Sequence, residues 1–359
     1  NTGKISQTQK YWMSQAPIRE DNMRRTGVAV IGCGAISKLH FDSIVNTPDT
    51  ELIYAVDINE KRAKDAASAY GCGFHTDYRE VLNDPAVHAV HLCTPHYLHC
   101  QMALDAMEKG KHVLTEKPMA ISPEDAERMI RKSEETGLTL GVCFQNRYNA
   151  TSVKIREALD SGRAGSILGA KASVTWNRDE GYYKADSWRG TWEMEGGGVL
   201  INQAIHTLDL LQWFAGDAVS VRGSCFKSLL ENVIEVEDSA QAIIKFDSGV
   251  NALFQATNCY CVNSPVSIEI ICTNATINLD GSLTIRYNDG KTECFTDDNP
   301  ITGEKSYWGY SHKLLIQDFY DCIHTGRKFT LDGHEGIKAL KIVKAIYKSS
   351  DTGQWVTLS

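Results

Sequence analysis

A glycine-rich turn directly follows the apolar run 28–31, and it reads Gly32, Cys33, Gly34, Ala35, Ile36 and Ser37. Gly32 permits a tight turn, and Gly34 lets a pyrophosphate approach the backbone at the start of a helix predicted over 35–45. Ser37 replaces the third glycine of the usual fingerprint, but its small side chain still allows helix and strand to pack closely. The order strand, turn, helix therefore predicts a dinucleotide-binding turn.

A carboxylate ends the next predicted strand, which covers 52–56. Asp57 lies about 20 residues beyond Gly34, where a carboxylate binds the adenosine ribose and repels a 2′-phosphate. We therefore expect NAD as the cofactor and regard NADP as disfavoured. The alternative interpretation is a plain turn followed by a solvated aspartate.

Two later strand ends carry further polar residues. Glu116, Lys117 and Pro118 follow an apolar stretch that ends at residue 114. Loops at the carboxyl ends of parallel strands face the ligand crevice, so Lys117 is predicted to lie beside the cofactor rather than in solvent. The preceding strand leads into Thr94, Pro95, His96 and His99. These two histidines either contact the cofactor or cap and pack the following helix.

A glycine triplet at 196–198 precedes a helix predicted over 200–214. On one continuous helix, Asn202, His206 and Asp209 share a face because their spacing is i, i+4 and i+7. A lone helical histidine is usually an interior residue, but three polar groups after a glycine triplet favour a site. Neither a fourth ligand nor a second histidine at short spacing supports a metal, so we predict no metal site.

The elements that position these residues change character near residue 150. Over 24–147, apolar runs alternate with helical patterns, which predicts an α/β fold with a doubly wound parallel sheet. Beyond 150, alternating patterns predict strands over 166–177, 217–226, 236–247, 250–258, 266–272 and 275–287. Hairpin turns are predicted at 247–249 and 288–290, and closing helices over 312–324 and 335–348.

These patterns divide the chain into three parts. We expect an N-terminal extension over 1–23, an NAD-binding domain over 24–147 and an α+β domain over 148–359. The α+β domain is expected to contain a large open, mostly antiparallel sheet. One face of that sheet needs a cover, and another subunit is the simplest candidate.

Taken together, these motifs resemble the glucose-fructose oxidoreductase/inositol dehydrogenase (Gfo/Idh/MocA) family. The resemblance runs from residue 24 to the C-terminus and includes the Glu-Lys-Pro segment, the junction 145–149, the helix after the glycine triplet, 237–238 and 312–319. It implies a Rossmann domain and an oligomer, a homodimer or homotetramer, built through the open sheet. It also implies hydride transfer between nicotinamide and a secondary hydroxyl of a sugar, sugar nucleotide or cyclitol.

The resemblance also implies residue roles. Lys117 matches the lysine that hydrogen-bonds the reacting hydroxyl, and His206 matches the histidine that commonly acts as acid and base. Many members have aspartate at position 202, whereas Asn202 can orient a hydroxyl but cannot accept its proton. The expected substrate residues are Asn202, Tyr148, Arg178, Trp188, Arg189 and His312. The expected cofactor residues are Gly32, Gly34, Ala35, Ile36, Asp57, Thr94, Pro95, His96, His99, Glu116, Lys117 and Gln145.

Several alternatives remain open at this point. Aromatic packing explains Trp188 equally well, and surface ion pairs explain Arg178 and Arg189. The stretch 188–203 is most similar to members that oxidise nucleotide-linked sugars at C3. An NAD-dependent glycosidase acting through transient C3 oxidation, a non-catalytic NAD(P) sensor and a structural oligomer are the other interpretations.

Composition narrows the class of partner. The formal net charge of −8 argues against a general nucleic-acid or anionic-membrane binder. Apolar runs stay well short of the roughly 20 residues that span a bilayer. The eleven cysteines are odd in number and lie mostly in apolar runs, which favours reduced thiols and a cytoplasmic protein. We expect a small sugar or polyol as substrate.

Overall fold

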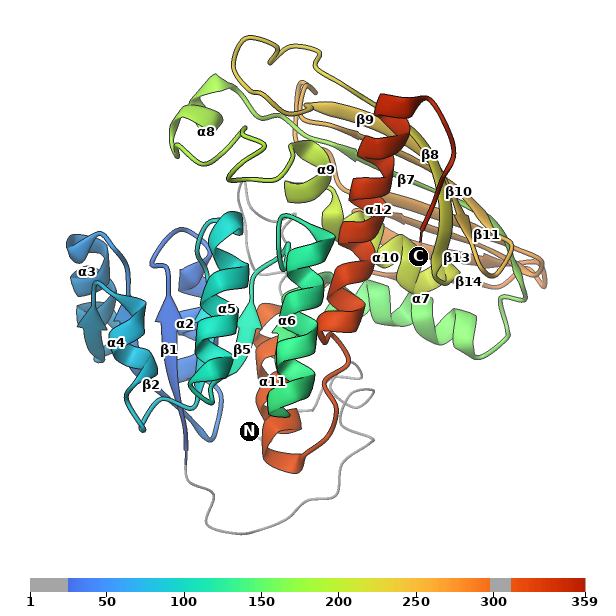
Figure 1. The fold of residues 1–359 in the computed structure, drawn as a ribbon. Helices are drawn as coiled ribbons and strands as arrows, with labels where there is room; N and C mark the ends of the chain where they lie inside the picture. Colours follow the sequence, from blue (N-terminus) through green and yellow to red (C-terminus); the bar gives the residue numbers. More distant parts are fainter. Residues whose placement is uncertain (1–24, 298–310, 359) are drawn as a thin grey trace. The chain divides into compact units, whose positions relative to one another are not determined.

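The computed structural model describes residues 25–297 and 311–358 (Figure 1). The expected extension at 1–23 lies outside the described residues. The chain divides into two compact units. The first unit holds residues up to 120 together with 124–145 and 311–336, and the second holds 121–123, 146–310 and 337–359.

The first unit is built on a parallel sheet, as the sequence predicts, and this sheet has six strands. The strand order is β3-β2-β1-β4-β5-β6. The strands are β1 (Thr26–Ile31), β2 (Thr50–Val56), β3 (Gly73–His75), β4 (Ala89–Leu92), β5 (His112–Thr115) and β6 (Leu140–Val142). Every residue of β1 and β4 is buried, because helices cover both faces of a doubly wound sheet. These apolar strands carry the loops that form the candidate site.

The connections of this sheet are helical. They are α2 (Ser37–Val45), α3 (Glu60–Tyr70), α4 (Tyr78–Leu82), η1 (His96–Leu98), α5 (His99–Glu108) and α6 (Pro123–Thr136). The edge strand β3 and the one-turn helix α4 have no counterpart in the sequence-based prediction. Both are short, and β3 is mostly exposed at the sheet edge, so neither produces a periodic apolar pattern.

A segment from the far end of the chain completes the first unit. Helix α11 (His312–Thr325) belongs to this unit, whereas the sequence-based division places it with the α+β domain. Phe319 and Tyr320 are fully buried, and Phe319 packs edge-on against Phe329 with ring centroids 5.4 Å apart. Sequence order hides this return of the chain, because an amphipathic helix does not encode which sheet it packs on.

The second unit contains a nine-stranded sheet with the order β14-β13-β12-β11-β7-β10-β9-β8-β15. Its strands are β7 (Ile167–Thr175), β8 (Ala218–Phe226), β9 (Ser239–Phe246), β10 (Asn251–Thr257), β11 (Ser267–Cys272), β12 (Ala275–Asp280), β13 (Ser282–Tyr287), β14 (Thr292–Phe295) and β15 (Val356–Thr357). Strands β7 and β10 pair in parallel, and the other pairs are antiparallel. The mostly antiparallel sheet is thus confirmed.

The hairpins test the turn predictions. Both predicted turns are confirmed, since 247–249 joins β9 to β10 and 288–290 joins β13 to β14. The prediction of one strand over 275–287 is wrong, because the chain reverses at Gly281, whose φ of 66° lies in the left-handed region. The resulting strands β12 and β13 pair with each other.

Helices of the second unit are α7 (Ala150–Asp160), α8 (Glu180–Lys184), α9 (Val199–Asn202), α10 (Ile205–Ala215) and most of α12 (Gly333–Thr352). The prediction of one helix over 200–214 is wrong, because the chain breaks between α9 and α10. The amide of Ala204 bonds the Val199 carbonyl at 2.8 Å, which is a wider turn than an α-helix makes. Asn202 therefore lies on a different helix from His206 and Asp209.

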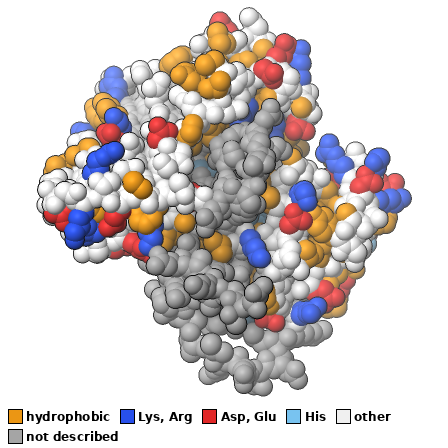
Figure 2. All heavy atoms as spheres, turned by 180° about the vertical axis from the view of Figure 1, so that it is seen from behind, with side chains coloured by type: hydrophobic (Ala, Val, Ile, Leu, Met, Phe, Trp, Pro, Cys, Tyr) orange, Lys and Arg blue, Asp and Glu red, His pale blue; other side chains and the backbone are white. Residues whose placement is uncertain are grey.

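The surface carries charges of both signs. On the face shown in Figure 2, acidic and basic side chains of the described residues are interspersed, with hydrophobic side chains between them. Among the described residues, none of the helices has the length and apolar character that crossing a bilayer requires.

Candidate active site

The glycine turn after β1 has the geometry of a dinucleotide site. Gly32 has a φ of 95°, and a Cβ there would lie 2.6 Å from the Cys93 carbonyl oxygen, so only glycine fits. A Cβ at Gly34 would meet no atom within 4 Å, so the protein itself does not require glycine at this exposed position. Open space beside this glycine at the start of a helix fits a pyrophosphate.

The helix begins slightly later than the sequence predicts. α2 starts at Ser37, so Ala35 and Ile36 belong to the turn, and Ile36 is the N-cap. The Ser37 hydroxyl donates to the Gly34 carbonyl at 2.7 Å and is buried. Ser37 thus closes the turn with a hydrogen bond where the usual third glycine closes it by packing.

Asp57 lies at the end of β2 and is fixed by backbone amides. Its two carboxylate oxygens accept hydrogen bonds from the Cys33 amide at 2.9 Å and the Asn59 amide at 2.8 Å. Asp57 is only partly buried, which leaves the carboxylate accessible. The turn and this carboxylate together fit the pyrophosphate and the ribose diol of NAD.

The loop after β4 shows how its histidines are used. Thr94 and Pro95 are half-buried, and His96 is buried in η1. His99 is fully buried, and its ring nitrogens each lie 2.8 Å from a carbonyl oxygen, one of Thr94 and one of Pro118. These contacts favour a packing role for His99 over contact with the cofactor, because they connect the loop after β4 to the Glu-Lys-Pro segment.

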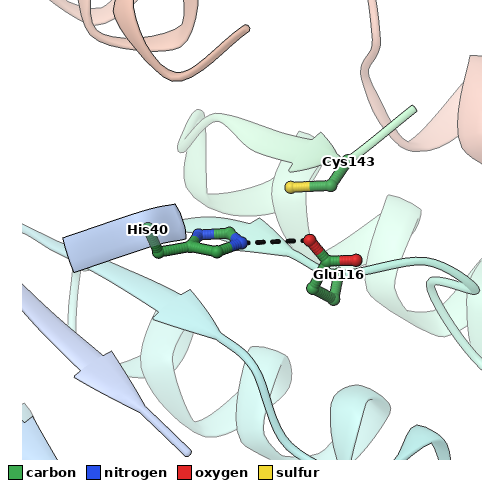
Figure 3. Close-up of side chains that lie close together, drawn as sticks. All are labelled: His40, Glu116 and Cys143. Atoms are coloured by element: carbon green, nitrogen blue, oxygen red, sulfur yellow. Dashed lines mark hydrogen bonds and ion pairs between the residues drawn. The ribbon is translucent and has the colours of Figure 1, made fainter. Parts of the chain in front are cut away.

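Glu116 is an interior carboxylate. It follows β5, and the His40 Nε2 and His312 Nε2 atoms lie 3.0 and 3.3 Å from the same carboxylate oxygen, Oε1. Its other oxygen accepts the Lys117 backbone amide at 3.3 Å. Figure 3 shows His40 and Glu116 pointing toward one another, with Cys143 beside them. The carboxylate therefore ties α2, α11 and the Glu-Lys-Pro backbone together.

A chain of hydrogen bonds continues inward from His40. Its Nδ1 lies 2.9 Å from His91 Nδ1, and His91 Nε2 lies 2.7 Å from the Tyr320 hydroxyl. A carboxylate only accepts, so His40 donates from Nε2 and, when neutral, accepts at Nδ1. His91 then donates from Nδ1 and accepts the Tyr320 proton at Nε2. Every hydrogen bond of the chain points toward the negative charge of Glu116.

The charge states support this direction. Burial alone would raise the pKa of Glu116, but hydrogen bonds from His312 and His40 lower that pKa well below its ordinary value. Burial lowers the pKa of His40, and burial together with His40 lowers the pKa of His91 well below its ordinary value. The chain thus combines one ionised carboxylate with neutral imidazoles.

The same interior contains three donor types that metals use. Ligand atoms of His40, Glu116 and Cys143 lie within 4.8 Å of one another. His40 and Glu116 are already hydrogen-bonded, and burial raises the pKa of the Cys143 thiol well above its ordinary value. A metal requires the thiolate, so this cluster fits hydrogen bonding better than metal binding.

Lys117 and Gln145 complete the candidate cofactor residues of the first unit. Lys117 is half-buried directly after Glu116, and its backbone is held by that carboxylate. Gln145 is buried at the start of η2 (Gln145–Tyr148). His312, predicted from the resemblance to bind substrate, is buried in the first unit against Glu116.

The glycine triplet of the second unit is explained by packing. A Cβ at Gly197 would lie 2.0 Å from the Tyr347 hydroxyl, and a Cβ at Gly198 would lie 1.8 Å from the Glu237 carbonyl oxygen. The Glu237 carboxylate accepts the amides of Gly198 at 2.9 Å and Leu200 at 3.0 Å. Glu237 therefore caps α9 from the loop that precedes β9. Burial raises the pKa of Glu237 to about 7 despite these donors.

The three polar residues expected on one helix face have different surroundings. Asp209 is buried and accepts two hydrogen bonds from Arg147, at 2.6 and 2.8 Å. Asn202 donates from Nδ2 to Glu195 Oε1 at 2.5 Å. His206 is half-buried on the first turn of α10. Asp209 thus serves the fold, which leaves Asn202 and His206 as site candidates.

An arginine–aromatic cluster surrounds the other predicted substrate residues. Arg189 donates to the Tyr182 hydroxyl at 2.7 Å and lies 4.5 Å from the Trp188 ring centroid. Arg178 lies 5.2 Å from the Tyr182 ring centroid and donates to Asn263 at 2.8 Å. Tyr148, another predicted substrate residue, is fully buried in η2.

Sequence reasoning missed the holding role of several polar side chains in these units. They are His40, His91, Glu195, Glu237 and Tyr320. His40 occupies a core-facing position of a helix, where it reads as part of the apolar stripe. The sequence could have indicated the role of His40 in one way, because a histidine on the buried stripe of a helix needs a polar partner.

Comparisons with known proteins agree over most of the chain. The family model described as the GFO_IDH_MocA oxidoreductase family, NAD-binding Rossmann fold, matches residues 26–144. The model of the GFO/IDH/MocA C-terminal domain matches residues 152–278. Scyllo-inositol 2-dehydrogenase (NAD(+)) of Bacillus subtilis is 26% identical over 304 residues, which cover 83% of this chain and 86% of that protein.

Solved structures give the same result. The WlbA dehydrogenase from Bordetella pertussis, solved with NADH and UDP-GlcNAcA, is 30% identical with a TM-score of 0.81 and covers 94% of this chain and 99% of that chain. The WlbA dehydrogenase from Chromobacterium violaceum was solved with the same two ligands and is 31% identical, with a TM-score of 0.82. The match covers 96% of this chain and 99% of that chain. The chain therefore belongs to the GFO/IDH/MocA family and is an NAD-dependent oxidoreductase acting on secondary hydroxyl groups of sugars, sugar nucleotides or cyclitols.

Proposed function

We propose that this enzyme oxidises a secondary hydroxyl of a nucleotide-linked, carboxylate-bearing sugar of the UDP-GlcNAcA type. The observation that carries the proposal is the 30% and 31% identity, over almost the whole chain, to two dehydrogenases solved with NADH and UDP-GlcNAcA. Arg178 and Arg189 are candidates to bind the anionic groups of such a substrate, since guanidinium groups pair with carboxylates and phosphates.

The proposed proton chemistry uses Lys117 and His206. A histidine has an ordinary pKa near 6.5, so its neutral ring can take the hydroxyl proton near neutral pH. The Lys117 ammonium stabilises negative charge that develops on the substrate oxygen. Asn202 orients a hydroxyl without taking its proton, because an amide has no basic site at neutral pH.

The cofactor residues are assigned on the geometry of the turn. Gly32, Gly34, Ala35 and Ile36 would hold the pyrophosphate, and Asp57 would bind the adenosine ribose. Thr94, Pro95, His96, His99, Glu116 and Gln145 line or support the strand ends of the same unit. NAD, when bound, supplies the hydride acceptor.

NADH absorbance in a substrate screen tests this proposal. The probes are UDP-GlcNAcA, levoglucosan, myo-inositol and scyllo-inositol, each with NAD and with NADP. We expect UDP-GlcNAcA with NAD to give the largest kcat/KM. Lys117→Ala should lower kcat at least 100-fold while NAD still binds by calorimetry, and near-normal turnover of that variant would contradict the mechanism. Release of UDP without net NADH would instead indicate a glycosidase.

The assembly is proposed from the exposed face of the large sheet. A row of paired residues crosses five strands on this face, and it consists of Arg222, Ile243, Leu253, Lys171 and Glu269. Leu253 is 58% exposed and Ile243 39% exposed. We propose that a second copy of the chain covers this face in a homo-oligomer of the cytoplasm. The molar mass from light scattering tests this, and a monomer at micromolar concentration would contradict it.

A further inference from the structure

A second buried carboxylate of the second unit has no role in the mechanism above. Glu195 lies just before the glycine triplet and is 1% exposed. Its Oε1 atom lies 2.5 Å from Asn202 Nδ2, and its Oε2 atom lies 2.5 Å from the Gly190 amide nitrogen. Each of these two contacts comes from an N–H group, so each oxygen of Glu195 accepts a hydrogen bond, which is the pattern that an ionised carboxylate makes.

This carboxylate connects two segments that carry candidate substrate residues. Gly190 directly follows Trp188 and Arg189, and Asn202 is the last residue of α9. Charge-assisted hydrogen bonds of this length are stronger than neutral ones. The geometry around Glu195 therefore fixes the position of the Asn202 side chain relative to the 188–190 segment.

The contact also fixes which way the Asn202 amide faces. In the structure the amide nitrogen Nδ2 faces Glu195, and the carbonyl oxygen Oδ1 therefore faces away from that carboxylate. An aspartate at position 202 would present an acceptor oxygen in the same place. In this protein the acceptor, Asn202 Oδ1, is neutral, and the negative charge lies on the neighbouring Glu195 side chain.

We propose that Glu195 is a positioning residue that orients Asn202, so that Asn202 Oδ1 accepts a hydrogen bond from a hydroxyl of the sugar substrate. Glu195 and Asn202 form a carboxylate–amide pair in which the charge sits at position 195. The proposal rests on the proposed function, because it assigns Asn202 to the sugar site. It predicts that the charge and the amide can exchange places.

Exchanging the two groups gives a specific pattern. In Glu195→Gln, the glutamine oxygen accepts the Gly190 amide and its nitrogen faces position 202, so Asn202 must rotate and present a donor to the substrate. In Asn202→Asp, two carboxylates approach within hydrogen-bond distance and repel. In the double variant, the glutamine at position 195 donates to the aspartate at position 202, and the outer oxygen of that aspartate accepts from the substrate.

The experiment measures KM for UDP-GlcNAcA and for NAD, with the thermal midpoint, in the wild type and these three variants. Each single variant should raise the KM for the sugar at least 10-fold. The double variant should return it to within about 3-fold of the wild type, with the KM for NAD unchanged throughout. A double variant as impaired as Asn202→Asp would overturn the proposal.

Two further variants, Asn202→Ala with and without Glu195→Gln, separate positioning from general support of the fold. If Glu195 acts through Asn202, then adding Glu195→Gln to Asn202→Ala should leave the sugar KM within about 2-fold of that of Asn202→Ala alone. A further 10-fold rise would show that Glu195 acts on the site by another route, which overturns the proposal. Glu237→Gln is the matched control, because Glu237 is also buried and accepts amides of α9 but does not contact Asn202 in the described hydrogen bonds.

Failure of the proposed function would look different. If the wild type oxidises levoglucosan or an inositol and not UDP-GlcNAcA, then the substrate assignment fails and the same five variants are measured on the substrate that is oxidised. The pattern of damage and rescue on that substrate would support the pairing of Glu195 with Asn202. Its absence there would overturn the pairing.

Discussion

Replacing Glu116 by glutamine keeps the shape of the side chain but removes the charge toward which the interior hydrogen bonds point. The carboxylate accepts from His40 and His312 on one oxygen and from the Lys117 amide on the other. Glutamine offers one acceptor and one donor group. Whichever way the amide is turned, its nitrogen faces at least one N–H donor, so one hydrogen bond is lost and the two donors oppose each other.

The expected loss of stability follows from these contacts. Hydrogen bonds to a charged group contribute about 1.5–3 kcal/mol each, and neutral ones about 0.5–1.5 kcal/mol. Making two bonds neutral therefore costs roughly 2–3 kcal/mol, and an unsatisfied buried donor costs about 1–3 kcal/mol more. We expect a loss of about 3–6 kcal/mol, a range that includes the usual cost of about 3–5 kcal/mol for breaking a buried ion pair. For a unit of this size, it lowers the thermal midpoint by about 6–24 °C.

The chain provides a matched control on its surface. Glu134 contacts His334 at 2.9 Å, close to the 3.0 Å of Glu116 and His40, but its side chain is 61% exposed. Glu134→Gln should change stability by no more than about 0.5 kcal/mol, as surface substitutions usually do.

Calorimetric midpoints of both variants give the comparison, and hydrogen exchange of α2 and α11 localises the effect. These helices should exchange faster in Glu116→Gln, because His40 and His312 lose their charged acceptor. An equal, small loss in Glu116→Gln and Glu134→Gln would refute the directed hydrogen-bond chain. Stoichiometric zinc in the purified wild type would refute it as well, in favour of a metal held by His40, Glu116 and Cys143.

Three further predictions concern the buried histidines and two of the glycines. Burial lowers the pKa values of His40, His91 and His99, so between pH 6.5 and 5 the unfolded chain binds protons that the folded protein does not. The free energy of unfolding should be highest above pH 6.5 and should fall toward pH 5, by up to about 1.4 kcal/mol per pH unit for each histidine. Urea unfolding midpoints at pH 7.5, 6.5 and 5.5 check this prediction, and equal midpoints would contradict it. Gly34→Ala should leave the thermal midpoint unchanged but weaken NAD binding at least 10-fold by calorimetry, since a methyl group there meets open space that only a ligand fills. Gly197→Ala should instead lower the thermal midpoint, because its Cβ would lie 2.0 Å from the Tyr347 hydroxyl, and an unchanged midpoint would show that the triplet is not required by packing.

The sequence by itself determined the parallel sheet and the glycine turn that follows its first strand. Local chemistry is sufficient for both, because apolar runs buried on two faces and a positive φ at Gly32 leave few alternatives. Asp57 and Lys117 follow in the same way, since each is placed by the end of a strand.

Only the tertiary structure decided what holds these residues. The return of α11 to the first unit brings His312 and Tyr320 to a hydrogen-bond chain whose other members come from β4, α2 and the end of β5. The same holds for the break between α9 and α10 and for the contact between Glu195 and Asn202. Both depend on hydrogen-bond partners that do not follow the periodic spacing of one helix. Periodicity reports how one residue lies relative to its neighbours in the chain, whereas a buried polar group is satisfied by whichever donor or acceptor the folded chain brings to it.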